Sequence, residues 1–432
     1  MMKRGLSSLV EPMIAQPISV ALLTGGGDRP YAFGLATSLM TGGVALDLIG
    51  SDDLDYPEFH GHPDVSFLNL RGSQNSDASL ASKVLRVSMY YARLVRYAAT
   101  AEPRIFHILW NNKFQYIDRT LLMLCYRFLG KVIVLTLHNV NAGKRDASDS
   151  SLNRLTLRIQ YRLSSHIFVH TEKMKLELME EFGQQEGRIT VIPFGINNAV
   201  PNTILTPADA KQRLGIHKGE RTILFFGNIT PYKGLEYLIA AFQQVLATRD
   251  AYRLIIAGAP KDSEGYWRTV QQAIDDVAPS GRVMLRAEFI PDDETEVFFK
   301  AADVAVLPYR SIYQSGVLFL AQSFGLPVIA ADVGSLREDI IEGRTGFLCK
   351  PRDPDDLAGA ITRYFESDLF EDLSSRRQEI RDYAARTHSW ETVAGATTKV
   401  YAELLARHPH TRHSVDEHQA SSRCASPDIP EV

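Results

Sequence analysis

The chain has 432 residues, of which 45% are hydrophobic and 23% are charged, a composition typical of a globular protein large enough for two domains. Its formal net charge of −4 gives no support to a nucleic-acid partner. The three cysteines lie far apart and form no C-x-x-C pair, which argues against a disulfide framework and favours a reducing compartment. No signal peptide and no run of roughly 20 apolar residues is evident, so we expect a cytoplasmic protein.

After an N-terminal extension, residues 1–17, short apolar runs alternate with longer amphipathic ones up to residue 200. The expected strands and the helices between them include residues 18–25, 31–43, 44–51, 105–110, 118–130, 131–139, 166–171 and 189–196. This alternation is typical of a parallel sheet with helices on its faces. We therefore predict an α/β, doubly wound, Rossmann-like domain over residues 18–200.

A second series of the same kind begins after residues 201–220, a polar, proline-bearing segment that we interpret as a linker. Its expected strands lie at residues 222–228, 253–258, 283–289, 304–309, 327–332 and 346–350. They predict a second Rossmann-like domain over residues 221–385, then a terminal helix, residues 386–407, and a polar, disordered tail, residues 408–432. Such domains bind ligands at the carboxyl ends of their strands, so we expect them to face each other across a cleft.

One lysine follows the first strand of the second domain, in the segment FFGNITPYKG. Lys233 lies in a short loop between this strand and a helix, where an ammonium group can meet a phosphate. The alternative is an ordinary exposed surface lysine.

The segment QSGVLFLAQSFGLP reads as a helix that begins at Ser315 and has no acidic residue in its first turn. The free N–H groups of a helix start carry partial positive charge and bind anions. Together with Lys233, they predict a diphosphate site. The alternative is that Ser315 is an ordinary N-cap of a buried helix.

The first domain offers polar and glycine residues at its strand ends. His138 and Asn139 follow one strand, Asn111 follows another, and the glycines Gly26 and Gly27 follow the first. Side chains of this kind suit a polyhydroxylated ligand, and glycines allow a close backbone approach. The alternatives are a structural histidine and a tight strand-to-helix turn.

Motifs for a metal site, a phosphate-binding loop or a covalent nucleophile are not evident. We find no H-E-x-x-H, no P-loop and no G-x-S-x-G. The histidines of the tail are consistent with a polar, disordered segment. We therefore expect no metal and no cofactor.

Three segments together resemble family 4 glycosyltransferases with the GT-B fold: HIFVHTEKMK with ITVIPFGI, FFGNITPYKGLEYLIAAF, and LPYRSIYQSGVLFLAQSFGLPVIAADVGSLREDIIEGRTGFL. The resemblance covers the chain from about residue 19 to about residue 405. It implies metal-independent transfer of a sugar, with retained anomeric configuration, from a nucleotide-sugar donor on the second domain to an acceptor on the first. It also implies that the terminal helix crosses back to the first domain.

The resemblance assigns roles by position. Lys233 and the backbone at the start of the helix would hold the donor diphosphate, and His138 would lie near the donor sugar. The full set is, as catalytic residues, His138 and Lys233; on the donor side, Gly227, Asn228, Gly258, Phe289, Ile290, Ser315, Gly316, Val317 and Leu318; on the acceptor side, Gly26, Gly27, Asn111 and Asn139.

The chain departs from the family pattern at two places. Asn228 stands where the family often has arginine, and the E-x7-E pair, anchored on the Gly-x-Pro that ends the helix, falls on Ile312 and Leu320. Gln314 and Gln322 share that spacing outside the anchored register, and we interpret this as a coincidence. Some members carry Gln-Ser-Gly-Val in place of the glutamates.

Two basic stretches lie in the first domain, KVLRVSMYYARLVRY and NRLTLRIQYRL. Their arginines are Arg86, Arg93, Arg96, Arg154, Arg158 and Arg162. They suit an anionic membrane surface or a polyprenyl-diphosphate-linked acceptor, and the alternative is a solvated face.

The sequence therefore predicts a glycosyltransferase that acts on a glycan or lipid-linked acceptor in surface polysaccharide or glycolipid synthesis. Its expected location is the cytoplasm, with a peripheral position at the inner face of the membrane as a further option. Two alternatives stay open: a non-catalytic subunit that binds sugar nucleotides, and a sugar-nucleotide epimerase of the same fold.

Overall fold

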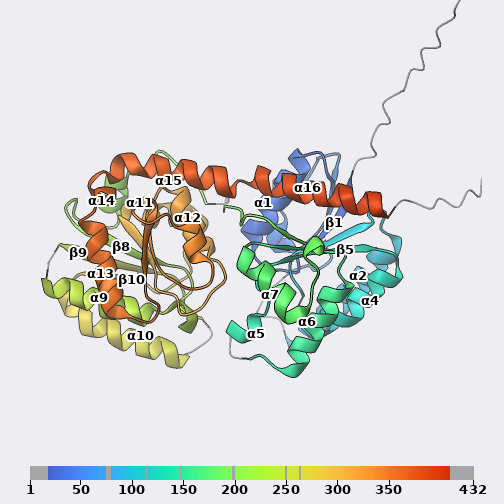
Figure 1. Cartoon of the computed structure of the whole chain (residues 1–432), viewed down its shortest axis with the longest axis horizontal. Coiled ribbons are helices and arrows are strands. Elements are labelled where there is room, and N and C mark those ends of the chain that lie inside the picture. Colours follow the sequence, from blue (N-terminus) through green and yellow to red (C-terminus); the bar gives the residue numbers. More distant parts are fainter. Residues whose placement is uncertain are drawn as a thin grey trace, which may run out of the picture.

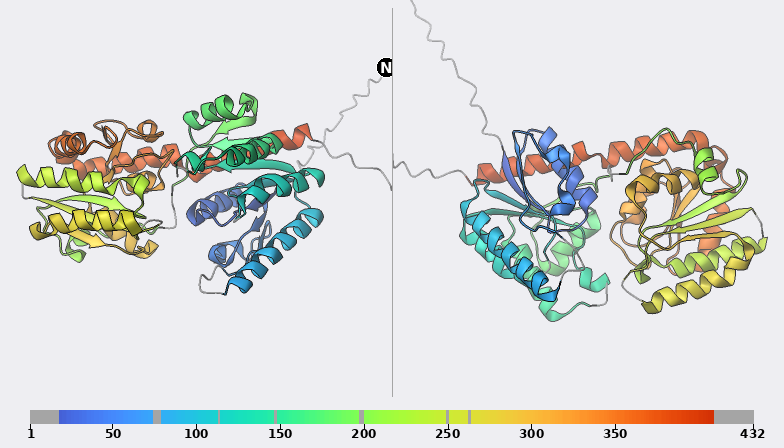
Figure 2. Two further views of the ribbon diagram at one scale, coloured as in Figure 1. Left: turned by 90° about the horizontal axis from the view of Figure 1, so that it is seen from below. Right: turned by 180° about the vertical axis from the view of Figure 1, so that it is seen from behind.

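The protein contains two parallel β-sheets, each with helices on both faces (Figures 1 and 2). The computed structural model describes residues 18–73, 79–112, 114–145, 148–196, 200–248, 251–261 and 264–408. The expected N-terminal extension, residues 1–17, and nearly all of the expected tail lie outside the described residues. The predicted fold class, with two doubly wound α/β domains, is confirmed.

The first sheet has seven strands in the order β3-β2-β1-β4-β5-β6-β7, and all of its strand pairs are parallel. The strands are β1 (Ser19–Leu23), β2 (Ala45–Ile49), β3 (Val65–Leu68), β4 (Ile105–Ile108), β5 (Val132–Leu137), β6 (His166–Val169) and β7 (Ile189–Val191). The order reverses between β1 and β4, which is the point where such sheets bind ligands.

Helices of the first domain form two layers. Helix α1 (Arg29–Thr41) shares one core with α16 (Trp390–Arg407), and the other face is covered by α2, α4, α6 and α7. The helices not yet delimited are α2 (Leu80–Thr100), α3 (Gln115–Ile117), α4 (Met123–Phe128), α5 (Ala142–Arg145), α6 (Ser151–Leu163) and α7 (Glu172–Phe182), with a π-helical turn at Asp118–Leu122. No helix in the described part of the chain combines the length and apolarity of a bilayer span.

Strand β3 is absent from the sequence-based prediction. It has four residues, forms one edge of the sheet, and has no fully buried position and one exposed position, Ser66. A short edge strand buries little apolar surface and therefore shows little hydrophobic pattern.

The second sheet has six strands in the order β10-β9-β8-β11-β12-β13. Its strands are β8 (Arg221–Phe226), β9 (Tyr252–Ala257), β10 (Val283–Arg286), β11 (Val304–Leu307), β12 (Val328–Ala331) and β13 (Gly346–Cys349). Its helices are α9 (Leu235–Thr248), α10 (Glu264–Val277), α11 (Asp292–Ala301), α12 (Gly316–Ser323), α13 (Pro354–Phe365), α14 (Asp368–Glu371) and α15 (Leu373–His388). Helices α9, α10 and α13 cover one face, and α11 and α12 cover the other.

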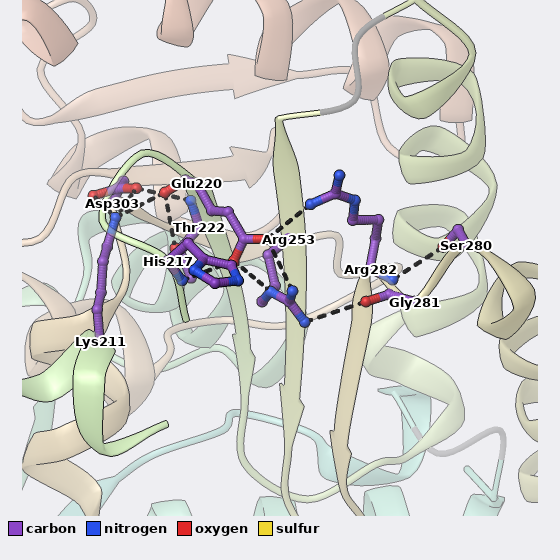
Figure 3. A network of polar contacts seen from close by, with 9 residues as sticks. All are labelled: Lys211, His217, Glu220, Thr222, Arg253, Ser280, Gly281, Arg282 and Asp303. Atoms are coloured by element: carbon purple, nitrogen blue, oxygen red, sulfur yellow. Dashed lines mark hydrogen bonds and ion pairs between the residues drawn. The ribbon is translucent and has the colours of Figure 1, made fainter. Parts of the chain in front are cut away.

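The segment interpreted as a linker contains a helix, α8 (Pro207–Arg213), and is fixed to the second domain (Figure 3). Lys211 of α8 pairs with Asp303 at 2.8 Å, and Glu220 accepts hydrogen bonds from Arg253 at 2.8 and 2.9 Å and from Arg282 at 2.7 Å. Hydrogen bonds from Arg253 lower the pKa of Glu220 despite its burial. Residues 207–220 therefore belong structurally to the second domain.

The chain returns to the first domain at its end, because α15 continues into α16, which packs against α1 (Figure 1). The Trp390 ring fills the space beside Gly34 and Gly195, and its Nε1 donates to the carbonyl of Ile196 at 2.6 Å. These contacts join the two ends of the first domain.

Replacing Glu220 with Ala should lower the free energy of unfolding by about 3–5 kcal/mol, because Arg253 and Arg282 would lose their shared carboxylate. Urea unfolding measures this loss. The matched control is Glu288→Ala, which removes an exposed partner of Arg286 and should cost less than about 1 kcal/mol. Equal losses in the two variants would contradict the structural role of the Glu220 network.

Candidate active site

A cleft of about 370 Å³ lies between the two sheets, at the carboxyl ends of their strands. Both domains line it. The first domain contributes Asp28, Pro30, Tyr31, Trp110, His138, Asn139, Phe194 and Gly195, and the second contributes Tyr232, Lys233, Tyr309, Ile312, Gln314, Ser315, Gly316, Val317 and Leu320.

Lys233 is buried in the wall of this cleft, with 7% of its surface exposed. Its Nζ has no hydrogen-bond or ion-pair partner among the described residues and lies 5.9 Å from the centre of the Tyr309 ring. A side chain at Gly227 would place its Cβ 2.8 Å from this Nζ, so the glycine leaves room for the ammonium group. Burial lowers the pKa of Lys233 to about 8. The alternative of an exposed surface lysine is therefore wrong.

The start of α12 lies next to Lys233, since Val317 and the Lys233 ammonium both border the space beside Gly227. Ser315 occupies the N-cap position, but its side chain does not cap the helix and instead pairs with the Tyr309 hydroxyl at 3.2 Å. The alternative of an ordinary Ser315 cap is therefore wrong.

Two backbone donors at this helix start are unused. The N–H of Leu318 donates to the Ser315 carbonyl at 3.0 Å, whereas the N–H groups of Gly316 and Val317 have no acceptor among the described residues. One wall of the cleft thus combines a desolvated cation with two free donors, and it contains no carboxylate from the second domain. This combination suits a diphosphate.

His138 lies in the opposite wall and stacks on Trp110, with ring centres 4.2 Å apart and planes 2° apart. A chain of contacts determines its tautomer. His170 Nδ1 lies 3.3 Å from the Ile192 carbonyl, which can only accept, so this nitrogen carries the proton. His170 Nε2 therefore accepts from His138 Nδ1, 3.2 Å away.

The remaining nitrogen of His138, Nε2, consequently carries a lone pair. It is buried and has no hydrogen-bond partner within the described residues. Burial lowers the pKa of His138 well below its ordinary value and that of His170 to about 4, so both rings are neutral near pH 7. His138 can accept a hydrogen bond from a hydroxyl in the cleft.

The other residues predicted on the acceptor side are divided between the cleft and its surroundings. Asn139 lines the cleft, and Asn111 lines an adjoining hollow of about 170 Å³ that shares Trp110, His138 and Asn139 with it. Gly26 and Gly27 instead pack against neighbouring side chains of the first domain. A Cβ at Gly27 would overlap the Trp110 ring, and one at Gly26 would overlap the Arg71 guanidinium. Close packing thus explains why both positions are occupied by glycine.

Several residues predicted on the donor side lie outside the cleft lining. Asn228 is exposed, Phe289 is 68% exposed and Ile290 is buried. Gly258 packs against the backbone of Gly227, where a Cβ would lie 2.2 Å from its carbonyl oxygen. The structure brings together Lys233, Ser315, Gly316 and Val317 on one side and His138 with Asn139 on the other.

Ile312 and Leu320, on which the family's glutamate pair is expected to fall from the sequence, both line the cleft. Gln314 also lines it, although the anchored register left this residue outside the site. Its Nε2 donates to the His170 carbonyl at 3.3 Å, and its Oε1 is buried and has no partner among the described residues. Gln322 is buried elsewhere and donates to the Asp339 carbonyl. The lining of the cleft therefore includes Gln314, with a buried amide oxygen, besides the apolar Ile312 and Leu320.

The sequence indicated aromatic side chains at the edge of the cleft but did not single out which residues they are. Tyr31 contacts Trp110, His138, His170 and Phe194, with ring centres 4.7 to 5.6 Å apart. Trp110 follows the end of β4 by two residues, so its strand-end position was a usable signal. His170 directly follows the end of β6 and therefore had the same signal, but its contact with His138 depends on packing between two strands.

Comparison with known proteins gives matches in both halves of the chain. Residues 25–200 match the family described as Glycosyltransferase Family 4, and residues 220–367 match Glycosyl transferases group 1. A D-inositol 3-phosphate glycosyltransferase of Acidothermus cellulolyticus is 30% identical over 240 residues, which are 53% of this chain and 51% of that protein. A glycogen synthase of Mycobacterium tuberculosis is 30% identical over 306 residues, which are 69% of this chain and 70% of that protein.

Solved structures share the arrangement of the two domains. A sucrose-phosphate synthase of Thermosynechococcus elongatus superposes with a TM-score of 0.73 at 20% identity, over 90% of this chain and 99% of the other. The Anabaena protein HepE, solved with UDP and glucose, superposes with a TM-score of 0.69 at 17% identity, over 89% and 100%. These likenesses confirm the GT-B fold. The chain matches about half the length of the inositol phosphate enzyme.

Replacing Lys233 with Met should raise the free energy of unfolding near neutral pH by roughly 2–3 kcal/mol, because it removes a buried cation that has no counter-charge. The folded-state pKa, about 8, lies below the ordinary 10.5, so the charged lysine destabilises the fold fully below pH 8. The difference in the free energy of unfolding between the variant and the wild type should shrink as the pH rises from 8 to 10.5. Urea unfolding across this range measures it, with the exposed Lys261→Met as control. A destabilised Lys233→Met protein would contradict the absence of a counter-charge.

Nitrogen-15 NMR of histidine-labelled protein should show His138 as the neutral tautomer with the proton on Nδ1. His138→Gln assigns the signal. In His170→Phe the acceptor for this proton is lost, so the signals of His138 should move toward a tautomer mixture. The control His60→Gln, on the surface, should leave them unchanged. A protonated Nε2 in the wild type would overturn the tautomer assignment.

Proposed function

The chain belongs to family 4 of the glycosyltransferases, and from this premise we propose that it transfers a sugar, with retained anomeric configuration, from a nucleotide-sugar donor. The proposed acceptor is a glycan or a polyprenyl-diphosphate-linked sugar of surface polysaccharide or glycolipid synthesis. The names of the two relatives indicate an inositol phosphate and a glucan, and these are the competing acceptor classes.

One observation supports this proposal most strongly: the cleft holds a cation and helix-start donors that have no partner in the described part of the chain. The Lys233 ammonium and the N–H groups of Gly316 and Val317 lie in one wall. A donor diphosphate would supply the missing negative charge to all three. Because Lys233 is already desolvated, the protein has met the cost of removing its water before the ligand arrives.

The same groups would assist the departure of the nucleoside diphosphate. Negative charge develops on the leaving phosphate oxygen as the sugar–oxygen bond breaks, next to Lys233 and the start of α12. That oxygen would accept the proton of the incoming acceptor hydroxyl on the same face of the sugar. His138 would hold the sugar by accepting a hydrogen bond at Nε2, and Gln314 would provide a further acceptor through Oε1. No metal or cofactor takes part in this scheme.

A second candidate is a subunit that binds sugar nucleotides without turning them over. The apolar side chains of Ile312 and Leu320 favour it, because they line the cleft at the positions of the family's glutamate pair. An alkyl side chain cannot bind a hydroxyl group of the donor. No observation specifically favours the epimerase alternative.

A Gly316→Asp variant tests the diphosphate site against a matched Gly316→Ala variant. A Cβ at Gly316 has no neighbour closer than 3.9 Å, so both variants should fold. The aspartate also favours the helix dipole and should not lower the melting temperature. We expect Gly316→Asp to weaken nucleoside diphosphate binding about tenfold or more, while Gly316→Ala stays near the wild type.

Binding and turnover are measured separately. Calorimetry with nucleoside diphosphates, beginning with UDP, gives affinity, and release of labelled sugar from nucleotide sugars gives turnover. Slow donor hydrolysis that is lost in Lys233→Met supports the transferase. Binding without turnover across donors and acceptors supports the subunit, and a nucleotide-linked isomer would reveal an epimerase. Wild-type affinity in a folded Gly316→Asp protein would overturn the diphosphate site.

A further inference from the structure

Helices α2, α4 and α6 of the first domain are neighbours (Figures 1 and 2). They and the short α3 expose apolar side chains on their outer side. Their inner sides share one core, which includes Tyr90 and Leu94 of α2, Met123 and Tyr126 of α4, and Leu157 of α6. The exposed side chains are Val84, Leu85, Met89 and Val95 of α2; Phe114, Tyr116, Ile117, Leu121, Leu124 and Phe128 on and beside α3 and α4; and Leu152 and Leu155 of α6. We call these residues the outer apolar face.

The centre of the outer apolar face is a regular ridge. Ile117, Leu121, Leu124 and Phe128 follow one another at helical spacing, with exposures of 42%, 65%, 50% and 91%. Single exposed leucines are common on protein surfaces, but a continuous ridge of this kind marks a surface that binds something.

The helices that carry the outer apolar face expose charges of one sign only, whereas beside them Asp149 pairs with Arg154 at 2.6 Å and Glu102 is exposed two residues after α2. Helices α2, α3, α4 and α6 expose no acidic side chain: their single acid, Asp118 in the intervening π-helical turn, is buried and accepts hydrogen bonds from Tyr91 and Asn112. The arginines that flank the ridge are Arg86, Arg93, Arg96, Arg127, Arg154, Arg158 and Arg162. The chain as a whole carries a net charge of −4, so this positive charge is local. The surface therefore fits a partner that is both apolar and anionic.

A small basic pocket of about 60 Å³ adjoins this face on the side of the cleft. Arg71, Lys83 and Arg86 line it with Tyr90 and Asn112. Arg71 donates to the carbonyl of Gly25 at 2.6 Å, in the glycine turn that packs against Trp110 of the cleft. The outer apolar face is thus continuous, through this pocket, with the acceptor side of the active site.

We propose that the outer apolar face docks on an anionic lipid bilayer, with the ridge in the headgroup–acyl boundary and the arginines on lipid phosphates. A bilayer offers an apolar layer beneath a negatively charged surface, which is the complement of this face. The docking itself does not depend on catalysis. Its use, presentation of a lipid-linked acceptor to the cleft, rests on the proposed function.

Two other occupants fit the surface less well. A second copy of the chain, joined through a two-fold axis, would bring the same arginines together, and the helices of this face expose no acid to pair with them; of these arginines, Arg154 has Asp149 as a partner beside its helix. A nucleic acid would satisfy the arginines but leave the ridge, including the 91% exposed Phe128, without an apolar partner.

Co-sedimentation of the full chain with vesicles tests the proposal. The wild type should bind phosphatidylcholine vesicles that contain about one third phosphatidylglycerol, and bind pure phosphatidylcholine at least tenfold more weakly. The variant Leu121→Ser/Phe128→Ser removes the ridge and should bind about tenfold more weakly or worse. The variant Arg93→Gln/Arg96→Gln should also bind more weakly and should depend less on salt.

Ile204→Ser is the matched control, because Ile204 is fully exposed outside this domain and should not affect vesicle binding. Unchanged melting temperatures and nucleoside diphosphate affinities show that the variants fold. Failure of the wild type to bind anionic vesicles at low salt would overturn the proposal, as would equal binding by the ridge variant. A concentration-dependent dimer that the ridge variant abolishes would overturn it in favour of a second copy. Vesicle binding without sugar transfer would support docking and contradict the proposed function.

Discussion

The position of the two walls of the cleft depends on the packing of one tryptophan. Trp390, at the start of α16, occupies space that exists only because residues 34 and 195 are glycines, and it donates to the carbonyl of Ile196. On one side of this contact α15 carries His388, which lies 4.3 Å from the Phe319 ring of α12. On the other side Trp390 contacts Tyr31, which packs against His138. His388 and Trp390, two residues apart in the chain, therefore connect the helix that offers free N–H groups with the histidine that faces it.

The two walls divide the chemistry between them. The second domain contributes positive charge through Lys233 and the start of α12, and the first contributes a neutral acceptor through His138. Burial produces both properties, since it penalises the charged form of lysine and of histidine alike. Lysine, with its higher ordinary pKa, stays mostly protonated near neutral pH, whereas the histidine loses its proton. The same desolvation thus yields opposite charge states across one cleft.

The first domain has two different faces. Helix α16 arrives from the other end of the chain to cover α1, whereas nothing in the described part of the chain covers the outer sides of α2, α4 and α6. The covered face fixes the active site, and the uncovered face combines an apolar ridge with arginines. The covered face borders the cleft through Pro30 and Tyr31 of α1, whereas the residues that line the cleft include none from α2, α4 or α6.

The sequence by itself determined what depends on local pattern: two doubly wound domains, and Lys233, His138 and the start of α12 placed at strand ends. Periodicity and strand ends are properties of neighbouring residues, so they can be read along the chain. The helix in residues 207–213 also had a local signal, because Thr206 is a suitable N-cap and Pro207 a suitable first residue; the Thr206 hydroxyl accepts from the Asp209 N–H. The polarity of this segment nevertheless favoured its interpretation as a linker. Only the tertiary structure decided that Lys233 is buried, that the hydroxyl of Ser315 turns to Tyr309 instead of capping its helix, and that Gln314 enters the cleft. Burial and choice of partner depend on residues brought together from distant parts of the chain, and local patterns contain no information about which residues those are.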